Sequence, residues 1–376
     1  MDIKSNYFKM DNKEFEVYLS EIKKSVNTIS FFDGKFFFTY ESNVINKLES
    51  LQRKVMDLDY LINSFSESIK TIIKKNMLVL EIKATNEIEN IYTSIENIYS
   101  ILNNTSKCVD NKIISICNSY KILFEDKVFE IATLKDIRAL FDMLFIDCIS
   151  KEDLPDGRYL RKKPVFISDG IKTVHTGIIN EEEIERKLEE LITFYNSNEN
   201  VFLKMILFHF LFEYVHPFYD GNGRIGRYLF SNGINMKSYS ITKYIISSSI
   251  LFDKSKYYKA FKIANDRYQF GCLNEFVNMF IEILENYIDK LTSEIIDNKS
   301  VIEKLLTVER TKSEMKIFKF LCEASIYTTI GVSSQKIIDE VDVSKRTVIY
   351  ALNKLREEEI LVETKIGKYH FYKIAL

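Results

Sequence analysis

The sequence is poor in the residues that make tight turns, with 11 glycines and 3 prolines among 376 residues. These two residue types usually make up about 12% of a globular protein. An all-β sandwich or barrel needs many turns, so this shortage argues against such folds. We therefore expect a mainly α-helical protein.

The sequence also lacks a run of about 18 to 20 apolar residues, which a membrane-spanning helix requires. Its first ten residues, MDIKSNYFKM, are too polar for a secretory signal. Lys and Arg number 52 against 54 Asp and Glu, a formal charge of −2. This balance excludes a polycation that coats nucleic acid or an anionic membrane. We expect a cytoplasmic protein without a membrane partner.

The cysteines and histidines are scattered. The 5 cysteines are odd in number, far apart and form no CxxC pair, and the 4 histidines are equally dispersed. Neither pattern fits a disulfide framework or a structural zinc site. His209 lies in an apolar segment, and we expect it to be a core residue.

Apolar periodicity predicts helices over most of the chain and two β-hairpins. The hairpins are expected at residues 31–40, FFDGKFFFTY, and at residues 160–176, where a Ser-Asp-Gly turn separates PVFI from IKTVHT. Helices are expected over residues 12–28, 42–106, 123–145, 181–196, 200–214, 224–235, 254–266 and 273–296. The helix over 200–214 is apolar nearly all round, which places it at the centre of the core.

The end of the chain has a different pattern. Three helices, at residues 314–323, 333–341 and 344–359, precede two alternating runs around Gly367. This is the order of a winged helix-turn-helix. We divide the chain into an N-terminal segment (1–56), a main domain (57–297), a linker (298–312) and a winged helix module (313–376).

The densest chemistry lies at residues 216–227, HPFYDGNGRIGR, between two apolar helices. Gly221 and Gly223 permit a tight loop whose N–H groups approach a ligand at the start of a helix, which is an anion site. Arg224 and Arg227 are three residues apart and project beside that loop. Two guanidinium groups next to backbone amides indicate a polyphosphate.

Two further residues of this segment complete the chemistry. Asp220 supplies a hard carboxylate that suits Mg²⁺. His216 is the one nearby group that takes a proton near neutral pH. Such features occur singly in ordinary turns, and their concentration within twelve residues favours transfer chemistry on a magnesium nucleotide.

Gly221, Gly223 and Gly226 also fit the dinucleotide fingerprint GxGxxG. That fingerprint requires a strand immediately before the first glycine. The preceding residues here are HPFYD, and no series of strand-helix units surrounds them. We therefore set the dinucleotide interpretation aside.

The segment HPFYDGNGRIGR resembles the signature of the Fic family, HPFx[D/E]GNGRxxR, at every specified position. The resemblance covers about residues 57–286. It implies a Fic-type helical core with a β-hairpin flap at residues 160–176. Most Fic proteins transfer AMP from Mg-ATP to a Ser, Thr or Tyr hydroxyl of a target protein.

The resemblance also implies a role for each motif residue. His216 would be the general base, Asp220 would hold Mg²⁺, Gly221, Asn222 and Gly223 would cradle the α- and β-phosphates, Arg224 and Arg227 would bind the β- and γ-phosphates, and Phe218 would anchor the loop in the core. Tyr257 and Tyr258 resemble tyrosines that lie near the adenine in this family, although twin tyrosines on a helix are also common in cores.

A second resemblance lies upstream, at residues 85–90, TNEIEN. Thr85, Glu89 and Asn90 match the inhibitory pattern [S/T]xxxE[G/N] of Fic proteins, which implies an inhibitory helix at about residues 85–105. Glu89 would pair with Arg227 and block the γ-phosphate. The same residues also suit an ordinary helix capped by Thr85.

Together these features imply a protein adenylyltransferase that Glu89 inhibits, with ATP as substrate and Mg²⁺ as cofactor. The target protein would dock on the flap hairpin, and self-modification and a homo-oligomer are also expected. Two alternatives stay open. In the first, the site removes AMP from a target, as it does in some relatives. In the second, the chain is a regulator that binds DNA through residues 313–376, and nucleotide binding or self-modification controls that binding. Residues 313–376 would otherwise bind a protein.

Overall fold

The computed structural model describes residues 3–103, 111–146, 149–168, 173–236 and 241–376. Within these residues the chain is mainly helical, with two two-stranded sheets and one three-stranded sheet. The predicted fold class is confirmed. No helix in the described ranges combines the length and the apolar character that crossing a membrane requires.

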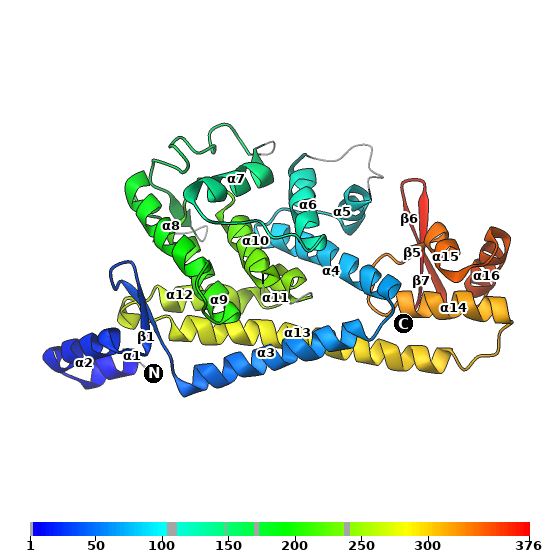
Figure 1. The fold of residues 1–376 in the computed structure, drawn as a ribbon, viewed down its shortest axis with the longest axis horizontal. Helices are drawn as coiled ribbons and strands as arrows, with labels where there is room; N and C mark the ends of the chain where they lie inside the picture. The colour runs from blue at the N-terminus through cyan, green and yellow to red at the C-terminus, as the bar shows by residue number, and fades with distance from the viewer. Residues whose placement is uncertain (1–2, 104–110, 147–148, 169–172, 237–240) are drawn as a thin grey trace.

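The N-terminal end holds two short helices and a hairpin, drawn in dark blue in Figure 1. Their bounds are α1 Ile3–Lys9, α2 Asn12–Lys24, β1 Thr28–Phe31 and β2 Phe36–Thr39. The side chain of Asp11 accepts hydrogen bonds from the first turn of α2, which explains why that helix begins at residue 12. The hairpin confirms the aromatic hairpin predicted at residues 31–40.

Two long helices, α3 (Ser42–Asn63) and α13 (Asn274–Leu305), run parallel and side by side along one face of the molecule (Figure 1). Lys47 bonds Glu282 across them at 2.9 Å. Helix α13 runs through residues 298–305, which we expected to belong to a linker. The boundary expected at residue 57 likewise falls inside α3.

The remaining helices of the main body pack around α9 and α10. Their bounds are α4 Glu67–Ile88, α5 Ile95–Leu102, α6 Asn111–Phe124, α7 Leu134–Phe145, α8 Glu181–Tyr195, α9 Val201–Val215, α10 Asn222–Asn235, α11 Ile246–Phe252 and α12 Lys254–Ala264. Short 3₁₀ helices cover Thr242–Tyr244 and Arg267–Gln269. Thirteen of the fifteen residues of α9 are buried, as its apolar surface predicts.

Two predicted helices are shorter in the structure than in the sequence analysis. The helix expected over 42–106 is broken at residues 64–66 and again at residues 89–94. The helix expected over 123–145 is wrong in its first third, because α6 ends at Phe124 and α7 begins at Leu134. Between them, Asn232 bonds both the N–H and the carbonyl of Phe129, so a side chain replaces the main-chain partners that a helix would supply.

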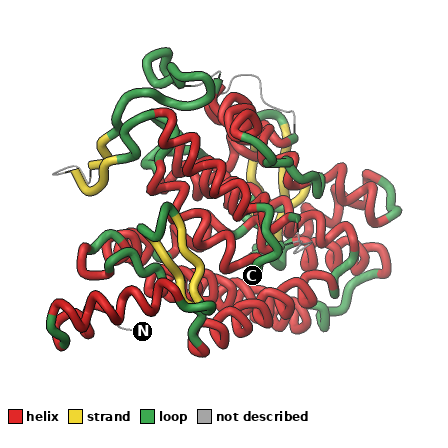
Figure 2. Tube along the Cα trace, turned by 60° about the vertical axis from the view of Figure 1, so that its left-hand side comes forward, coloured by secondary structure: helices red, strands yellow, loops and turns green. Residues whose placement is uncertain are grey.

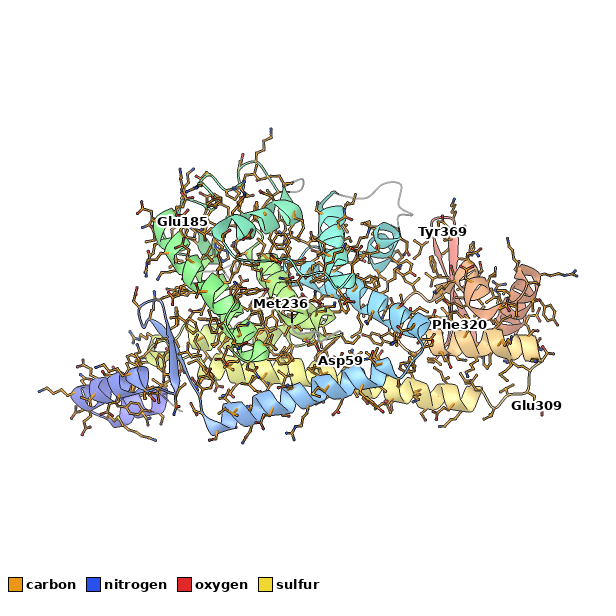
Figure 3. All side chains as sticks on the ribbon, in the orientation of Figure 1. Asp59, Glu185, Met236, Glu309, Phe320 and Tyr369 are labelled. Atoms are coloured by element: carbon orange, nitrogen blue, oxygen red, sulfur yellow. The ribbon has the colours of Figure 1, made fainter. Side chains whose placement is uncertain are left out.

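The C-terminal module consists of α14 Lys312–Ala324, β5 Val332–Ser333, α15 Ser334–Val341, α16 Lys345–Glu357, β6 Leu361–Ile366 and β7 Tyr369–Ile374. Its sheet has the order β5-β7-β6 and is antiparallel throughout. The short segment that joins it to α13 contains Glu309, labelled in Figure 3.

Contacts of the module with α4 and α5 join it to the main body. The side-chain carbonyl of Asn76, on α4, accepts hydrogen bonds from the N–H and the hydroxyl of Thr329 at 2.9 and 2.8 Å. The ring of Tyr99, on α5, meets the ring of Phe371 edge to face at 5.1 Å. The apolar residues of the module are continuous with the central core.

The flap expected at residues 160–176 is represented by β3 Phe166–Ser168 and β4 Thr173–Thr176, which form an antiparallel hairpin. Figure 2 shows this hairpin at the edge of the molecule, away from the helical body. The turn that we placed at residues 168–170 lies partly outside the described residues. Leu160 and Arg161 precede the hairpin and are fully buried.

Candidate active site

His216 ends helix α9 in the left-handed conformation, with φ 53° and ψ 63°. This conformation is uncommon for a residue with a side chain, and here it turns the chain sharply out of the helix. The N–H of His216 donates to Phe212 at 2.9 Å, and the imidazole Nδ1 lies 3.3 Å from the carbonyl oxygen of Glu213. The imidazole therefore sits at the corner between the core helix and the motif loop.

Phe218 and Asn222 close the loop. The ring of Phe218 is fully buried and stacks on Phe141 at 4.3 Å. The side-chain amide of Asn222 accepts from the N–H of Phe218 at 2.9 Å and donates to its carbonyl at 2.8 Å. The structure thus places Phe218 in the core, as expected, and uses the side chain of Asn222 to hold the loop rather than to face a ligand.

Gly221 makes the turn into α10. Its φ is +86°, and a Cβ there would lie 2.8 Å from the ring of Phe145. Asp220, beside it, accepts from the N–H of Gly221 at 2.6 Å and from Arg224 at 3.1 Å. The side chain of Asp220 is 55% exposed, so its carboxylate is accessible at the mouth of the loop.

Arg224 and Arg227 project from the first turns of α10. Arg224 lies over the ring of Phe145 at 4.4 Å, and its Nε has no hydrogen-bond partner among the described residues. Arg227 is 1% exposed. Its Nε donates to the hydroxyl of Thr85 at 3.0 Å, and its Nη2 donates to the carbonyl of Thr85 at 3.0 Å and to Glu89 at 2.8 Å.

The carboxylate of Glu89 lies at the N-terminal end of α10. A Cβ at Gly223 would be 2.2 Å from Glu89 Oε1 and 2.9 Å from Arg227 Nη1. The first N–H groups of a helix lack partners within the helix and attract anions. Glu89 therefore occupies the position in which the sequence predicts a phosphate.

The electrostatics of this contact keep Glu89 charged. Burial by itself would raise the pKa of Glu89, but the positive charge and hydrogen bond of Arg227, with smaller contributions from Arg224 and His216, lower it below its ordinary value. Burial likewise opposes the charge of Arg227, and Glu89, Tyr257 and Glu213 together raise its pKa. The two groups form an ion pair at neutral pH.

Glu89 does not lie on the inhibitory helix expected at residues 85–105. Helix α4 ends at Ile88, and Asn90 adopts the left-handed conformation at φ 59°. Asparagine tolerates this conformation and commonly ends helices. Thr85 is inside the last turns of α4 and is no N-cap, so the expected helix is replaced by the end of α4, a six-residue bend and α5.

Tyr257 and Tyr258 lie beside the ion pair, since the charges of Glu89 and Arg227 act on both. Tyr257 is buried, and its hydroxyl bonds Nε2 of His209 at 2.9 Å. Tyr258 is half exposed on α12. His209 is fully buried, as expected of a core residue.

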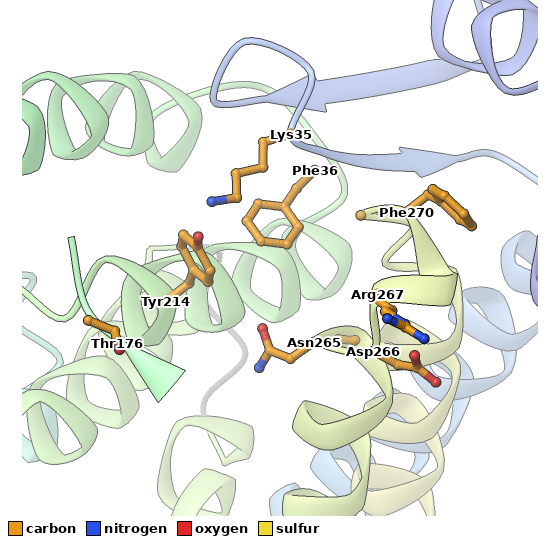
Figure 4. Close-up of a pocket in the computed structure, with 10 residues that line it drawn as sticks. Lys35, Phe36, Thr176, Tyr214, Asn265, Asp266, Arg267 and Phe270 are labelled. Atoms are coloured by element: carbon orange, nitrogen blue, oxygen red, sulfur yellow. The ribbon is translucent and has the colours of Figure 1, made fainter. Parts of the chain in front are cut away.

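A cavity of about 560 Å³ opens near the loop (Figure 4). It is lined by the β1–β2 hairpin, the end of β4, Tyr214 on α9 and the C-terminal end of α12. Tyr214 precedes His216 by two residues, and Thr176 precedes Gly177, where a Cβ would lie 3.2 Å from the Cβ of His216. Neither His216 nor Tyr257 and Tyr258 line this cavity.

Two residues of the site escaped the sequence analysis. The guanidinium group of Arg161 bonds the carbonyls of the loop, and Glu213 lies close to Arg227. Burial raises the pKa of Glu213 to about 8, with Arg227 opposing the shift and Glu89 adding to it. The available signal for Glu213 was its position as the one acid in the apolar helix 201–215.

The donor set fits a Mg²⁺ ion that is bound mainly through phosphate. Among the described residues no three acidic, histidine or cysteine side chains gather into a metal cage. Mg²⁺ usually takes one or two carboxylates, with phosphate oxygens and water completing its shell. The accessible carboxylate of Asp220, close to the N-terminal end of α10, would be one such ligand.

Comparison with known proteins finds similarity in sequence and in fold. Residues 131–232 match the family model of the Fic/DOC family. The fold is similar to that of a Fic family protein from Desulfovibrio desulfuricans, with a TM-score of 0.58 and 17% identity over 90% of this chain and 97% of the other. Fic-1 from C. elegans has a TM-score of 0.49 and 17% identity to this chain, over 77% of this chain and 79% of the other.

Proposed function

Because residues 131–232 form a Fic/DOC family domain, we propose that this chain is a protein adenylyltransferase that Glu89 holds inactive. The substrate is ATP, and the acceptor is a Ser, Thr or Tyr hydroxyl of a target protein or of the chain itself. The observation that carries the proposal is the carboxylate of Glu89, which lies 2.8 Å from Arg227 and against Gly223 at the start of α10.

The first step is seating the triphosphate. The first N–H groups of α10 bind phosphate oxygens, and Arg224 and Arg227 neutralise the β- and γ-phosphates. Asp220 would hold Mg²⁺, which supplies additional charge neutralisation when bound. Transfer at phosphorus depends mainly on such positioning and charge stabilisation.

The second step is transfer. His216 takes the proton of the acceptor hydroxyl, the hydroxyl oxygen forms a bond to the α-phosphorus, and the bond between that phosphorus and the bridging oxygen of the β-phosphate breaks. Pyrophosphate leaves and AMP stays on the target. The strands of the flap offer main-chain groups to an extended target segment.

Inhibition follows from competition for one cation. Arg227 cannot bond Glu89 and the γ-phosphate with the same Nη2 group, so a triphosphate bound in the presence of Glu89 is held in another position. Releasing the acid frees the guanidinium and the end of α10 together.

The test is incorporation of labelled AMP from ATP and Mg²⁺ by purified variants. We expect Glu89→Gly to raise self-modification about 10- to 100-fold, the range of a typical coupling energy, and His216→Ala to abolish it in that background. Glu87→Gly is the matched control, because Glu87 lies in the same turn and pairs with Lys83 instead. Equal labelling of all four proteins would refute the assignment.

Intact mass after incubation with each nucleoside triphosphate identifies the group transferred, because AMP and UMP differ in mass. Loss of AMP from a modified target in the presence of Glu89, and its absence from Glu89→Gly, would instead favour the removal reaction.

A second candidate function is DNA binding by the C-terminal module. It rests on the three helices and antiparallel sheet of residues 312–374 and on the exposure of Lys345 and Arg346 at the start of α16 and of Lys365 and Lys368 at the β6–β7 turn. Basic residues in these places suit phosphate contacts. A mobility shift that weakens steeply with salt would support it, whereas no shift at low salt favours a protein partner.

A further inference from the structure

We propose that Arg161 is a positioning residue that fixes the catalytic conformation of His216 and ties it to the base of the flap. The inference rests on the proposed function and adds a residue that neither the motif nor the inhibitory pattern contains.

The guanidinium group of Arg161 bonds three main-chain carbonyls. Its Nε donates to His216 at 2.7 Å, its Nη1 to Lys163 at 2.6 Å and its Nη2 to Val215 at 3.4 Å. The N–H of the same residue donates to the carbonyl of Pro217 at 3.2 Å. One residue thus holds three consecutive residues of the loop and the start of the flap.

The burial of this charged side chain costs free energy of folding. The side chain of Arg161 is 0% exposed, and among the described residues its hydrogen-bond acceptors are carbonyls, with no carboxylate to balance its charge. Arginine is rarely buried fully without a partner of opposite charge. Burial lowers its pKa to about 10, so it is still charged at neutral pH.

The guanidinium group of Arg161 contacts the C-terminal end of helix α9. The last carbonyls of a helix lack partners within it, and those of Val215 and His216 find theirs in the guanidinium group. A planar group with several fixed donors sets the directions of these carbonyls together. The left-handed turn at His216, and with it the direction of the imidazole, is therefore held by Arg161.

Gly177, the residue after β4, packs against the guanidinium group of Arg161. A Cβ at Gly177 would lie 2.6 Å from Arg161 Nη2 and 3.2 Å from the Cβ of His216. A target hydroxyl docked on the flap is thereby placed relative to the imidazole that deprotonates it. A misplacement of about 1 Å between such groups costs about 100-fold in rate.

The experiment uses the full chain with Glu89→Gly as the active parent. We expect Arg161→Ala to lower kcat about 100-fold while the dissociation constant for Mg-ATP, measured by calorimetry, changes less than about threefold. Methylguanidinium at about 20 mM should restore kcat at least about tenfold by occupying the space left by the side chain, and methylammonium at the same concentration should not. Arg158→Ala, at an exposed arginine three residues earlier, should leave kcat unchanged.

A second readout does not need transfer activity. The chain has 4 histidines, so the imidazole signal of His216 can be assigned by its loss in His216→Ala. Arg161→Ala should shift or broaden that signal, and methylguanidinium should return it. If Arg161→Ala does not fold, Arg161→Lys, which keeps the charge and supplies a single donor group, takes its place and should show the same loss and no rescue.

The outcomes separate the two proposals. An unchanged kcat and imidazole signal in the Arg161 variant, or a parallel loss of ATP affinity and rate, overturns the role of Arg161. An inactive parent overturns the proposed function, and the imidazole signal then still decides whether Arg161 positions His216.

Discussion

Two almost fully buried arginines, Arg161 and Arg227, border the motif loop, and the structure holds them in opposite ways. Arg227 is surrounded by acids, with Glu89 bonded to it and Glu213 close by. Arg161 bonds only carbonyls among the described residues. An ion pair can be exchanged for another anion, whereas carbonyls of the chain cannot leave. The first arginine therefore suits binding and release, and the second suits a fixed scaffold.

The largest effect should come from replacing Arg227, the arginine whose anionic partner can be exchanged. In the Glu89→Gly background, Arg227→Gln should lower kcat/KM for ATP about 100-fold or more, because the guanidinium that bonds Glu89 in this structure is then missing from the proposed γ-phosphate position. Steady-state labelling at several ATP concentrations measures it. Arg186→Gln, at a half-exposed arginine that pairs with Asp33, is the control. A variant as active as its parent would mean that Arg227 serves inhibition alone.

The next effect concerns the second acid beside Arg227. Folding raises the pKa of Glu213 to about 8, so the folded protein keeps a proton that the unfolded chain loses above about pH 4.5. The wild type must then lose stability relative to Glu213→Gln as the pH rises from about 4.5 to 8, with no further change above.

Thermal unfolding of both proteins across this range measures the difference, which should reach about 4 kcal/mol at pH 8. Glu189→Gln, at an exposed position on α8, should show no such trend. A constant difference between wild type and Glu213→Gln would show that Glu213 is charged at neutral pH and shares Arg227 with Glu89.

A smaller effect should follow from weakening the inhibitory contact. Thr85→Val removes the hydroxyl that accepts from Arg227 Nε at 3.0 Å but keeps the main-chain carbonyl and Glu89. Self-modification should rise about threefold, less than in Glu89→Gly. Thr85→Ser keeps the hydroxyl and should behave as wild type, and a rise in both variants would point to packing instead.

The last prediction is that lowering the pH from 7 to 5.5 does not release the inhibition by Glu89. Arg227 lowers the pKa of Glu89 below 4.5, after outweighing burial, so the acid stays charged from pH 5.5 to 7. The ratio of Glu89→Gly activity to wild-type activity should be constant over that range. A ratio that falls toward one at pH 5.5 would show that protonation already releases the wild-type acid.

The motif residues were predictable because their geometry is local. Gly221, Asp220 and Arg224 interact within five residues of chain, and the order of the residues fixes their relation. The contact of Glu89 with Arg227 spans 138 residues, and only the resemblance to a known inhibitory pattern brought the two together.

Arg161 could not be found in this way. It lies in GRYLRKKP, a basic segment in which Arg158, Lys162 and Lys163 look equivalent from the sequence. Which of them is buried depends on where the end of α9 presents its carbonyls, and that is a tertiary property. The breaks in the predicted helices have similar causes, since Asn90 turns the chain without a glycine and Asn232 replaces the helical partners of Phe129.

Helix α4 carries Asn76, bonded to Thr329 of the C-terminal module, and ends next to Glu89. Thirteen residues separate the two, or about 20 Å of unbroken helix. No break in the helix lies between the contact with the module and the carboxylate of Glu89. Helix α4 thus directly connects the C-terminal module with the carboxylate that lies at the N-terminal end of α10.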